Sequence, residues 1–195
     1  MYRNIFLALT CAVVACGPAR EPAAPIEMTA SGAASHSMTG MGDMSQIQYA
    51  SLSPEIQRQV DRLRVITAPF VKLDAARKAG WDARITNCFS DPQLGGMGFH
   101  YGNTGFINDG KANVDQPELL LYEPQADGRL RFVAVEYVVP FSLWTQPQPP
   151  RLYGQFFHRN EAFGLWILHV WHVANNPRGI FSDWNPTVSC QFARQ

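Results

Sequence analysis

One carboxylate occupies a position where an apolar side chain is expected. Glu136 lies in a strand-like run and is expected on the same strand face as Phe132 and Ala134. Burying a carboxylate is costly unless a cation, a hydrogen-bond donor or a metal ion compensates its charge. The expected partner of this carboxylate is an arginine such as Arg131 or Arg159, a histidine, a metal ion or a ligand cation.

Two histidines lie in an apolar run, 164–173. In a strand, His169 shares a face with Ile167 and Trp171, and His172 points the other way. In a helix, the two histidines would lie on one side, at a spacing that can seat a metal ion. The β-branched and aromatic residues favour the strand, which makes His169 the stronger candidate ligand. The alternative is a core histidine that is only hydrogen-bonded.

A third candidate, His100, lies in the glycine-rich segment 95–103. The surrounding stretch, 86–110, is rich in Gly, Asn and Asp and is predicted to be an irregular loop. Glycines allow unusual backbone angles and close approach of a ligand. No Gly-Lys-Ser/Thr is present, so a phosphate loop is not indicated. His100 is expected to be a ligand or acid/base group, or else to pack on Tyr101 in a turn.

These three side chains form a reasonable ligand set for a metal ion. We expect His100, Glu136 and His169 to meet in one cleft and to bind a small ligand or a divalent metal ion such as zinc, copper or iron. Such a set leaves a position open, where metal-activated water would be the chemistry of an enzyme. No serine-hydrolase, zincin or covalent-haem motif is present. A separation of more than about 10 Å would instead indicate a structural or interaction module, since metal ligands lie about 2 Å from the ion.

The first residues predict export as a bacterial lipoprotein. Arg3 precedes an apolar stretch that is too short to span a bilayer and that ends in Ala15-Cys16. Residues 1–15 are predicted to be the signal peptide, and Cys16 the acylated first residue of the mature chain. The lipid would anchor the protein to the cell envelope, on its periplasmic or outer-surface side. The alternative is an ordinary signal peptide cut near Ala15.

Residues 16–48 are predicted to be a flexible tether, because small and polar residues dominate them. Within this segment Met38, Met41 and Met44 recur at every third position, and His36 lies just upstream. Thioethers are soft ligands that suit Cu(I). An alternative function is therefore a copper-handling accessory protein, unless these methionines are incidental to a low-complexity tether.

Cys88 and Cys190 remain as an even pair in an oxidising compartment, which favours a disulfide over two buried thiols. The bond would close a loop of about 100 residues and stabilise the fold by roughly 4–5 kcal/mol in the chain-entropy model.

These residues are expected in a single α+β domain, 49–195, in which an N-terminal helical pair packs on a small antiparallel sheet. Ser53 followed by Pro54 predicts a helix start, and a second helix is expected to end near Gly80. Strands are predicted over 118–123 and 130–139, joined across the turn signal Asp-Gly at 127–128. A turn and a short strand are expected in the tail, 184–190.

The overall charge excludes one class of partner. The chain has 16 Lys and Arg against 16 Asp and Glu, for a formal net charge of zero. A nucleic-acid backbone requires a basic surface patch, and the sequence shows none. We therefore expect the membrane and a small ligand as partners, and no nucleic acid.

Several short motifs follow one another between about residues 75 and 190. They are Ala-Gly-Trp at 79–81, Gly-Gly-Met-Gly-Phe-His-Tyr at 95–101, Pro-Glu-Leu-Leu-Leu-Tyr-Glu-Pro at 117–124, Val-Glu-Tyr at 135–137, Leu-His-Val-Trp at 168–171, Asn-Pro-Arg-Gly at 176–179, and Trp-Asn-Pro-Thr-Val-Ser-Cys at 184–190. Together they resemble a family of uncharacterised exported bacterial proteins. The resemblance implies that His100, Glu118, Glu136 and His169 belong to the family pattern and that His172 does not. It implies no mechanism.

Overall fold

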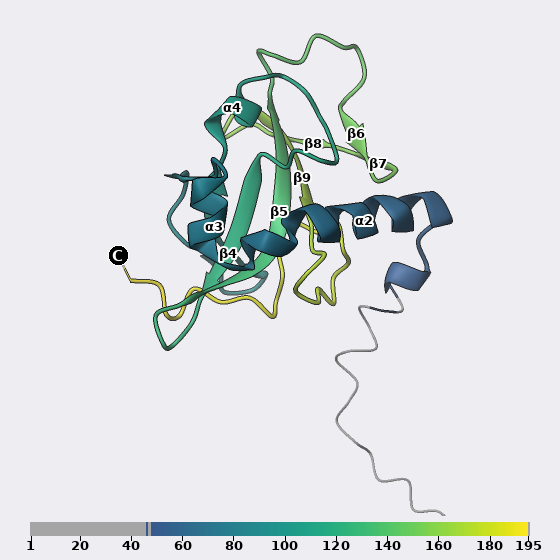
Figure 1. The fold of residues 1–195 in the computed structure, drawn as a ribbon. Helices are drawn as coiled ribbons and strands as arrows, with labels where there is room; N and C mark the ends of the chain where they lie inside the picture. The colour runs from purple at the N-terminus through teal and green to yellow at the C-terminus, as the bar shows by residue number, and fades with distance from the viewer. Residues whose placement is uncertain (1–45, 47, 195) are drawn as a thin grey trace, which may run out of the picture. The chain divides into compact units, whose positions relative to one another are not determined.

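An antiparallel sheet of seven strands organises the domain (Figure 1). The computed structural model describes residue 46 and residues 48–194. The strands of the sheet are β1 (Ala83–Arg84), β2 (Phe89–Asp91), β3 (Gly95–Gly102), β4 (Leu119–Pro124), β5 (Leu130–Pro140), β8 (His158–Asn160) and β9 (Leu165–Val170). Their order is β1-β3-β4-β5-β9-β8, and β2 also pairs with β3. A separate hairpin joins β6 (Arg151–Leu152) to β7 (Gln155–Phe156).

The helices are α2 (Pro54–Thr67), the 3₁₀ turn η1 (Ala68–Val71), α3 (Leu73–Lys78) and the single turn α4 (Thr104–Ile107). The Ser53 side chain accepts a hydrogen bond from the Ile56 N–H, which is the expected cap at the start of α2. The chain leaves α3 through Gly80, whose φ of 106° suits a glycine. No described helix has the length and apolar character needed to cross a bilayer.

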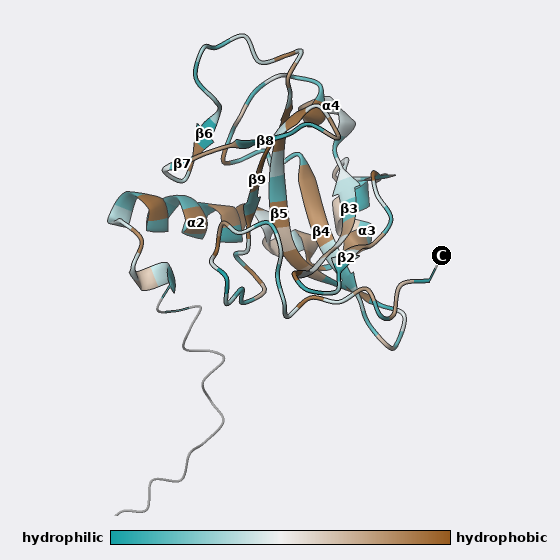
Figure 2. Cartoon of the chain, turned by 180° about the vertical axis from the view of Figure 1, so that it is seen from behind, coloured by the Kyte–Doolittle hydropathy of each residue, from teal (hydrophilic) through white to brown (hydrophobic). Residues whose placement is uncertain are grey.

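Each face of the sheet carries its own apolar core. Val60 and Leu63 of α2 and Ala76 of α3 pack with one face, which includes Tyr122 and Tyr137. In Figure 1, α2 lies across the strands on this side. The hydropathy colouring shows β4 as mostly hydrophobic, as expected of a strand buried on both faces (Figure 2).

The opposite face is covered by the C-terminal part of the chain. Leu121, Val138 and Ile167 of the sheet pack there with Trp171 and Val188. The disulfide between Cys88 and Cys190 joins this segment to the residue before β2. The mixed helix and antiparallel-sheet class and the predicted disulfide are therefore confirmed.

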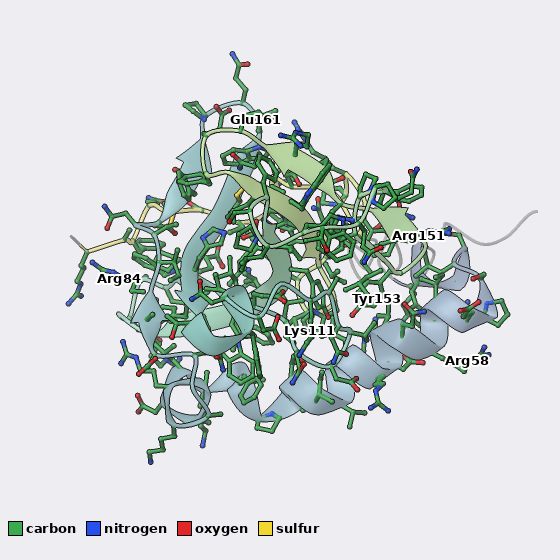
Figure 3. The ribbon with its side chains drawn as sticks, turned by 90° about the horizontal axis from the view of Figure 1, so that it is seen from above. Arg58, Arg84, Lys111, Arg151, Tyr153 and Glu161 are labelled. Carbon is green, nitrogen blue, oxygen red and sulfur yellow. A yellow bond between two sulfur atoms is a disulfide. The ribbon has the colours of Figure 1, made fainter. Side chains whose placement is uncertain are left out.

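Charged side chains lie mainly at the periphery of the described domain. Arg58, Arg84 and Glu161 are exposed and project from its edge in Figure 3. Tyr153, in contrast, is buried beside α2, where its backbone N–H donates to Gln59 Oε1 at 3.0 Å. Its hydroxyl lies 2.7 Å from that of Tyr137, which links the β6–β7 hairpin to the sheet.

The predicted loop over 86–110 is wrong, because this stretch contributes β2, β3 and α4. Glycine has a low strand preference, so the sequence suggests a loop. Here the glycines allow other backbones to approach β3. A Cβ on Gly98 would lie 2.4 Å from the backbone carbonyl oxygen of Tyr122, and a Cβ on Gly96 would lie 2.6 Å from that of Val188. The sheet is therefore larger than the small one expected.

Two further predictions need correction. The register between β4 and β5 shifts after Leu121, so that Leu121 pairs with Ala134 and Tyr122 with Phe132. This bulge places Phe132 on the helix-covered face, opposite Ala134 and not beside it. The tail over 184–190 contains no strand and only one isolated bridge, between Asn185 and Gly96.

Some predictions concern residues outside the described part of the chain. They are the signal peptide at 1–15, the lipidation of Cys16, and the copper-binding tether residues His36, Met38, Met41 and Met44.

Candidate metal centre

Three buried side chains from three strands meet on the face of the sheet away from the helices. They are His100 of β3, Glu136 of β5 and His169 of β9. Nε2 of His100 lies 3.4 Å from Glu136 Oε2, and Nε2 of His169 lies 3.8 Å from Oε1. The candidate ligand atoms all lie within 4.8 Å of one another. This group could hold a metal ion.

The curvature of the sheet makes this meeting possible. Strands β3 and β9 are separated by β4 and β5, which corresponds to about 14 Å in a flat sheet. The ring centroids of His100 and His169 are nevertheless only 6.3 Å apart. The bulge in β5 and the positive φ of Gly98, 88°, lie in the strands that must bend. The centre therefore depends on the curl of the whole sheet.

The second nitrogen of each imidazole has its own partner. Nδ1 of His100 lies 2.9 Å from Thr86 Oγ1, and Nδ1 of His169 lies 3.2 Å from Asp183 Oδ1. A hydrogen on each Nδ1 satisfies both contacts and leaves the Nε2 lone pairs facing Glu136. Metal-binding histidines are usually oriented in this way by an acceptor for the other ring nitrogen.

His169 Nε2 is the clearest sign of a missing partner. Its side chain is only 1% exposed, yet this atom has no hydrogen-bond partner among the described residues. Buried polar atoms are nearly always paired, and an unpaired one requires an explanation. A metal ion among the three ligands would supply the missing interaction.

Burial and neighbouring charges tune the three groups differently. Burial, together with the nearby His169, lowers the pKa of His100 to about 3, so this ring is neutral. Burial raises the pKa of Glu136. For His169, burial acts to lower the pKa, but the carboxylates of Glu136 and Asp183 outweigh it and raise the pKa.

Asp183 extends the centre toward the surface. Its Oδ2 lies 3.0 Å from Nε2 of His158, whose side chain is 47% exposed. Burial would raise the pKa of Asp183, but hydrogen bonds with His158 and His169 hold it well below its ordinary range. A continuous hydrogen-bonded path thus runs from the exposed imidazole through the carboxylate to the buried ligand.

Asp183 was not predicted from the sequence, because it lies in an irregular segment. The only signal is chemical: a metal-binding His169 requires an acceptor, and Asp183 is the first acidic residue that follows it in the chain.

A cavity of about 270 Å³ opens onto the three ligands. Apolar side chains form most of its wall, and Trp184 of the C-terminal segment contributes to it. At its rim, Phe89 and Phe163 meet edge to face, with 6.2 Å between ring centroids. A small molecule could therefore reach the ligand atoms without unfolding the domain.

The expected arginine partners of Glu136 are engaged elsewhere. Arg131 pairs with Glu123 at 2.6 Å, and Arg159 pairs with Glu161 at 2.6 Å. His172 also lies away from the cluster, on the helix-covered side, where its Nε2 is 2.9 Å from Thr67 Oγ1. His172 lies beyond the end of β9, which stops at Val170, and its side chain lies on the opposite side of the sheet from His169, as predicted.

No protein-family model, curated protein or solved structure matches the chain. The resemblance to exported bacterial proteins stays a prediction. Geometry and chemistry carry the functional assignment.

Proposed function

We propose that this protein is a membrane-tethered exported domain that binds a divalent metal ion through His100, Glu136 and His169. The observation that carries the proposal is the buried, unpartnered Nε2 of His169 beside a buried carboxylate. A divalent cation there would pair with Glu136 and would lie one imidazole away from Asp183. The two carboxylates would then balance the charge of the ion.

The number and type of the ligands support a site of catalytic type. Ligands placed about 2.1 Å from a tetrahedral ion lie about 3.4 Å from one another. The separation between His100 Nε2 and Glu136 Oε2, 3.4 Å, matches this value, whereas that between His169 Nε2 and Glu136 Oε1, 3.8 Å, is longer, so the side chains would move closer around an ion. Three protein ligands leave at least one position for water or a small ligand, as in zinc enzymes with two histidines and a glutamate. The same set is found in iron oxygenases, and imidazole also suits copper.

If the domain is an enzyme, water bound at the open position is the expected nucleophile, because a metal ion lowers the pKa of its bound water. Glu136 and the two histidines would then hold the ion, while the cavity would hold the substrate. Asp183, which also contacts His158, would hold the His169 ring in its orientation toward the ion.

Metal analysis of the purified full chain tests the proposal. We expect one zinc, copper or iron ion per chain, or uptake of one equivalent on titration. His169→Ala and Glu136→Gln should each abolish binding. The matched controls are His172→Gln, at another buried histidine, and Glu161→Gln, at an exposed glutamate; both should keep full stoichiometry. Absence of metal and of uptake in the folded wild-type protein would refute the proposal.

The proposed anchor is tested separately. Cys16 should incorporate radiolabelled palmitate in a bacterial host, and Cys16→Ser should release the protein from the membrane fraction. Unchanged membrane association of the Cys16→Ser variant would contradict a lipid anchor at this residue.

A further inference from the structure

We infer that the cavity above the three ligands takes a small, uncharged and mainly apolar molecule that directs one oxygen or nitrogen atom at the metal ion. The inference rests on the proposed metal site and names the class of ligand that this site accepts. It follows from the lining, the size, the mouth and the charge of the cavity.

The lining offers little to a charged or strongly polar molecule. Its walls include Ile85, Met97, Leu119, Leu165 and Ile167. No lysine or arginine among the described residues lines it, so a carboxylate or phosphate would find no cationic side chain. Apart from the cluster, the polar groups of the lining are the indole N–H of Trp184 and the side chains of Thr86 and Asn160, and none of them is charged.

Those two side chains have partners within the domain. Thr86 Oγ1 lies 2.9 Å from His100 Nδ1, and Asn160 Oδ1 accepts a hydrogen bond from the Phe163 N–H at 3.3 Å. Among the described residues that line the cavity, the buried side-chain atom without a hydrogen-bond partner is Nε2 of His169. The metal position is therefore the main polar feature of the cavity, and most of the ligand is expected to be apolar.

The volume limits the size of the ligand. At about 270 Å³ the cavity lies just below the range of roughly 300–1,000 Å³ that is usual for sites of drug-sized ligands. One six-membered ring with a short substituent fits this space. A sugar, a nucleotide or a peptide is excluded by size or by polarity.

The mouth has the same character as the lining. Phe163 is 58% exposed, Ile85 46% and Phe89 37%, and all three line the cavity. Large apolar side chains that are exposed together at one opening indicate a binding site for apolar ligands. Phe163, in the turn between β8 and β9, contacts Phe89 of β2, so the two edges of the curved sheet form the entrance.

Charge balance argues for a neutral ligand. With neutral imidazoles, one divalent ion is matched by the carboxylates of Glu136 and Asp183. An anionic ligand would leave a net negative charge in a buried apolar site, and a cationic ligand would leave a positive one. A neutral hydroxyl, carbonyl or amine donor leaves the balance unchanged.

Three aromatic probes of similar size test this inference: toluene, benzyl alcohol and benzoate. The full chain is loaded with Co²⁺, whose visible spectrum reports a change of ligands at the metal. Probe binding to the metal-free and Co²⁺-loaded protein is followed by NMR. We expect toluene and benzyl alcohol to compete for one site, and benzyl alcohol alone to change the cobalt spectrum. Benzoate should bind at least tenfold more weakly than benzyl alcohol.

Two cavity variants locate the binding. Met97→Trp fills the cavity and should abolish probe binding while Co²⁺ stoichiometry stays at one. Val65→Trp, at an exposed position of α2, is the matched control and should bind the probes like the wild type. Phe163→Ala changes only the exposed mouth and should weaken both neutral probes severalfold without altering Co²⁺ affinity; it serves if Met97→Trp fails to fold.

The outcomes separate the two proposals. A wild-type protein that takes up no Co²⁺ overturns the metal site and, with it, a donor directed at the metal. Normal Co²⁺ uptake without binding of either neutral probe overturns only the inference about the cavity. Benzoate binding as tight as that of benzyl alcohol overturns the assignment to uncharged ligands.

Discussion

The two histidines of the cluster differ in the group that holds the second ring nitrogen. His100 is held by the hydroxyl of Thr86, whereas His169 is held by the carboxylate of Asp183. A carboxylate partner makes an imidazole a more basic metal ligand than a neutral partner does. In the proposed site, Asp183 would therefore strengthen the bond of His169 to the ion without itself contacting the ion.

Asp183→Asn tests that role. The amide oxygen can still accept a hydrogen bond from Nδ1, so the ring keeps its orientation while the negative charge is lost. We expect zinc affinity to fall by roughly 10–100-fold, measured by competition with a chelating dye. Asp74→Asn, at an exposed position of α3, is the control and should leave the affinity unchanged. Equal zinc affinity of Asp183→Asn and the wild type would show that the charge of Asp183 does not contribute to metal binding.

Glu118 is a buried carboxyl group outside the cluster. It is 2% exposed, and its Oε2 accepts a hydrogen bond from the Val138 N–H at 3.1 Å, which continues the ladder of β5 beyond the start of β4. Burial raises the pKa of Glu118 from 4.5 to about 9. The group is therefore neutral in the folded protein at pH 7 but ionised in the unfolded chain.

This shift makes stability depend on pH. Because the folded state holds a proton that the unfolded state releases above pH 4.5, the free energy of unfolding falls as pH rises toward 9. Glu118→Gln keeps an oxygen for Val138 and cannot ionise, so it should stabilise the protein at pH 7 by up to about 3 kcal/mol. Urea unfolding at pH 5, 7 and 8.5 measures this, and the gain should grow with pH. A constant difference between the two proteins would show that Glu118 is ionised in the fold.

The sequence identifies the three candidate ligands but not their surroundings. Glu136 and His169 stand out because a polar residue interrupts an apolar face, and strand alternation places His169 correctly beside Ile167. The predicted face of Phe132 was wrong, because a bulge adds one residue to the strand and no local sequence pattern indicates this bulge. Asp183 belongs to a segment without periodicity, so only the tertiary fold brings it to His169.

Among the elements, β3 differs most from its prediction. Local preference assigns a glycine-rich run to a loop, whereas β3 is a central strand paired on both sides. The tertiary fold overrides this preference, since the oxygens of Tyr122 and Val188 occupy the space that side chains would need. The helix cap at Ser53 and the hairpin between β4 and β5 depend only on neighbouring residues, and both were predictable.

Gly98→Ala tests the close approach of β3 and β4. Gly98 and Gly164 both have positive φ, 88° and 68°, but a Cβ on Gly164 meets nothing within 4 Å. Gly164→Ala should therefore cost only the backbone strain, about 1–2 kcal/mol. Gly98→Ala should cost more, because β3 must move away from the Tyr122 oxygen, and it should also weaken metal binding by displacing His100. Urea unfolding and metal titration of both variants measure this, and equal losses would contradict it.

At the scale of the whole molecule, the disulfide fastens the C-terminal segment across the open side of the curved sheet. It joins residues 102 positions apart, and Cys88 is followed directly by Phe89 of the cavity rim. The Ser189 N–H adds a hydrogen bond to Glu123 Oε1 at 2.8 Å. These two attachments, together with the bridge between Asn185 and Gly96, hold the segment that carries Asp183 and Trp184.

Removing the disulfide should weaken the attachment of this C-terminal segment to the sheet. Cys88→Ser combined with Cys190→Ser should lower the free energy of unfolding by about 4–5 kcal/mol, the chain-entropy value for a loop of this length. Denaturant unfolding measures the loss, and the wild-type protein in a strong reductant should match the double variant. A double variant as stable as the oxidised wild-type protein would show that packing alone holds the segment.

The position of Asp183 and Trp184 in the chain sets an order of assembly. A polypeptide that emerges with its N-terminus first presents His100, Glu136 and His169 before it presents the carboxylate that orients His169 and the indole that walls the cavity. Cys190, whose disulfide with Cys88 fixes this C-terminal segment, follows later in the chain. An ion supplied early would therefore meet the three candidate ligands while they are still accessible. The C-terminal residues would then cover the site.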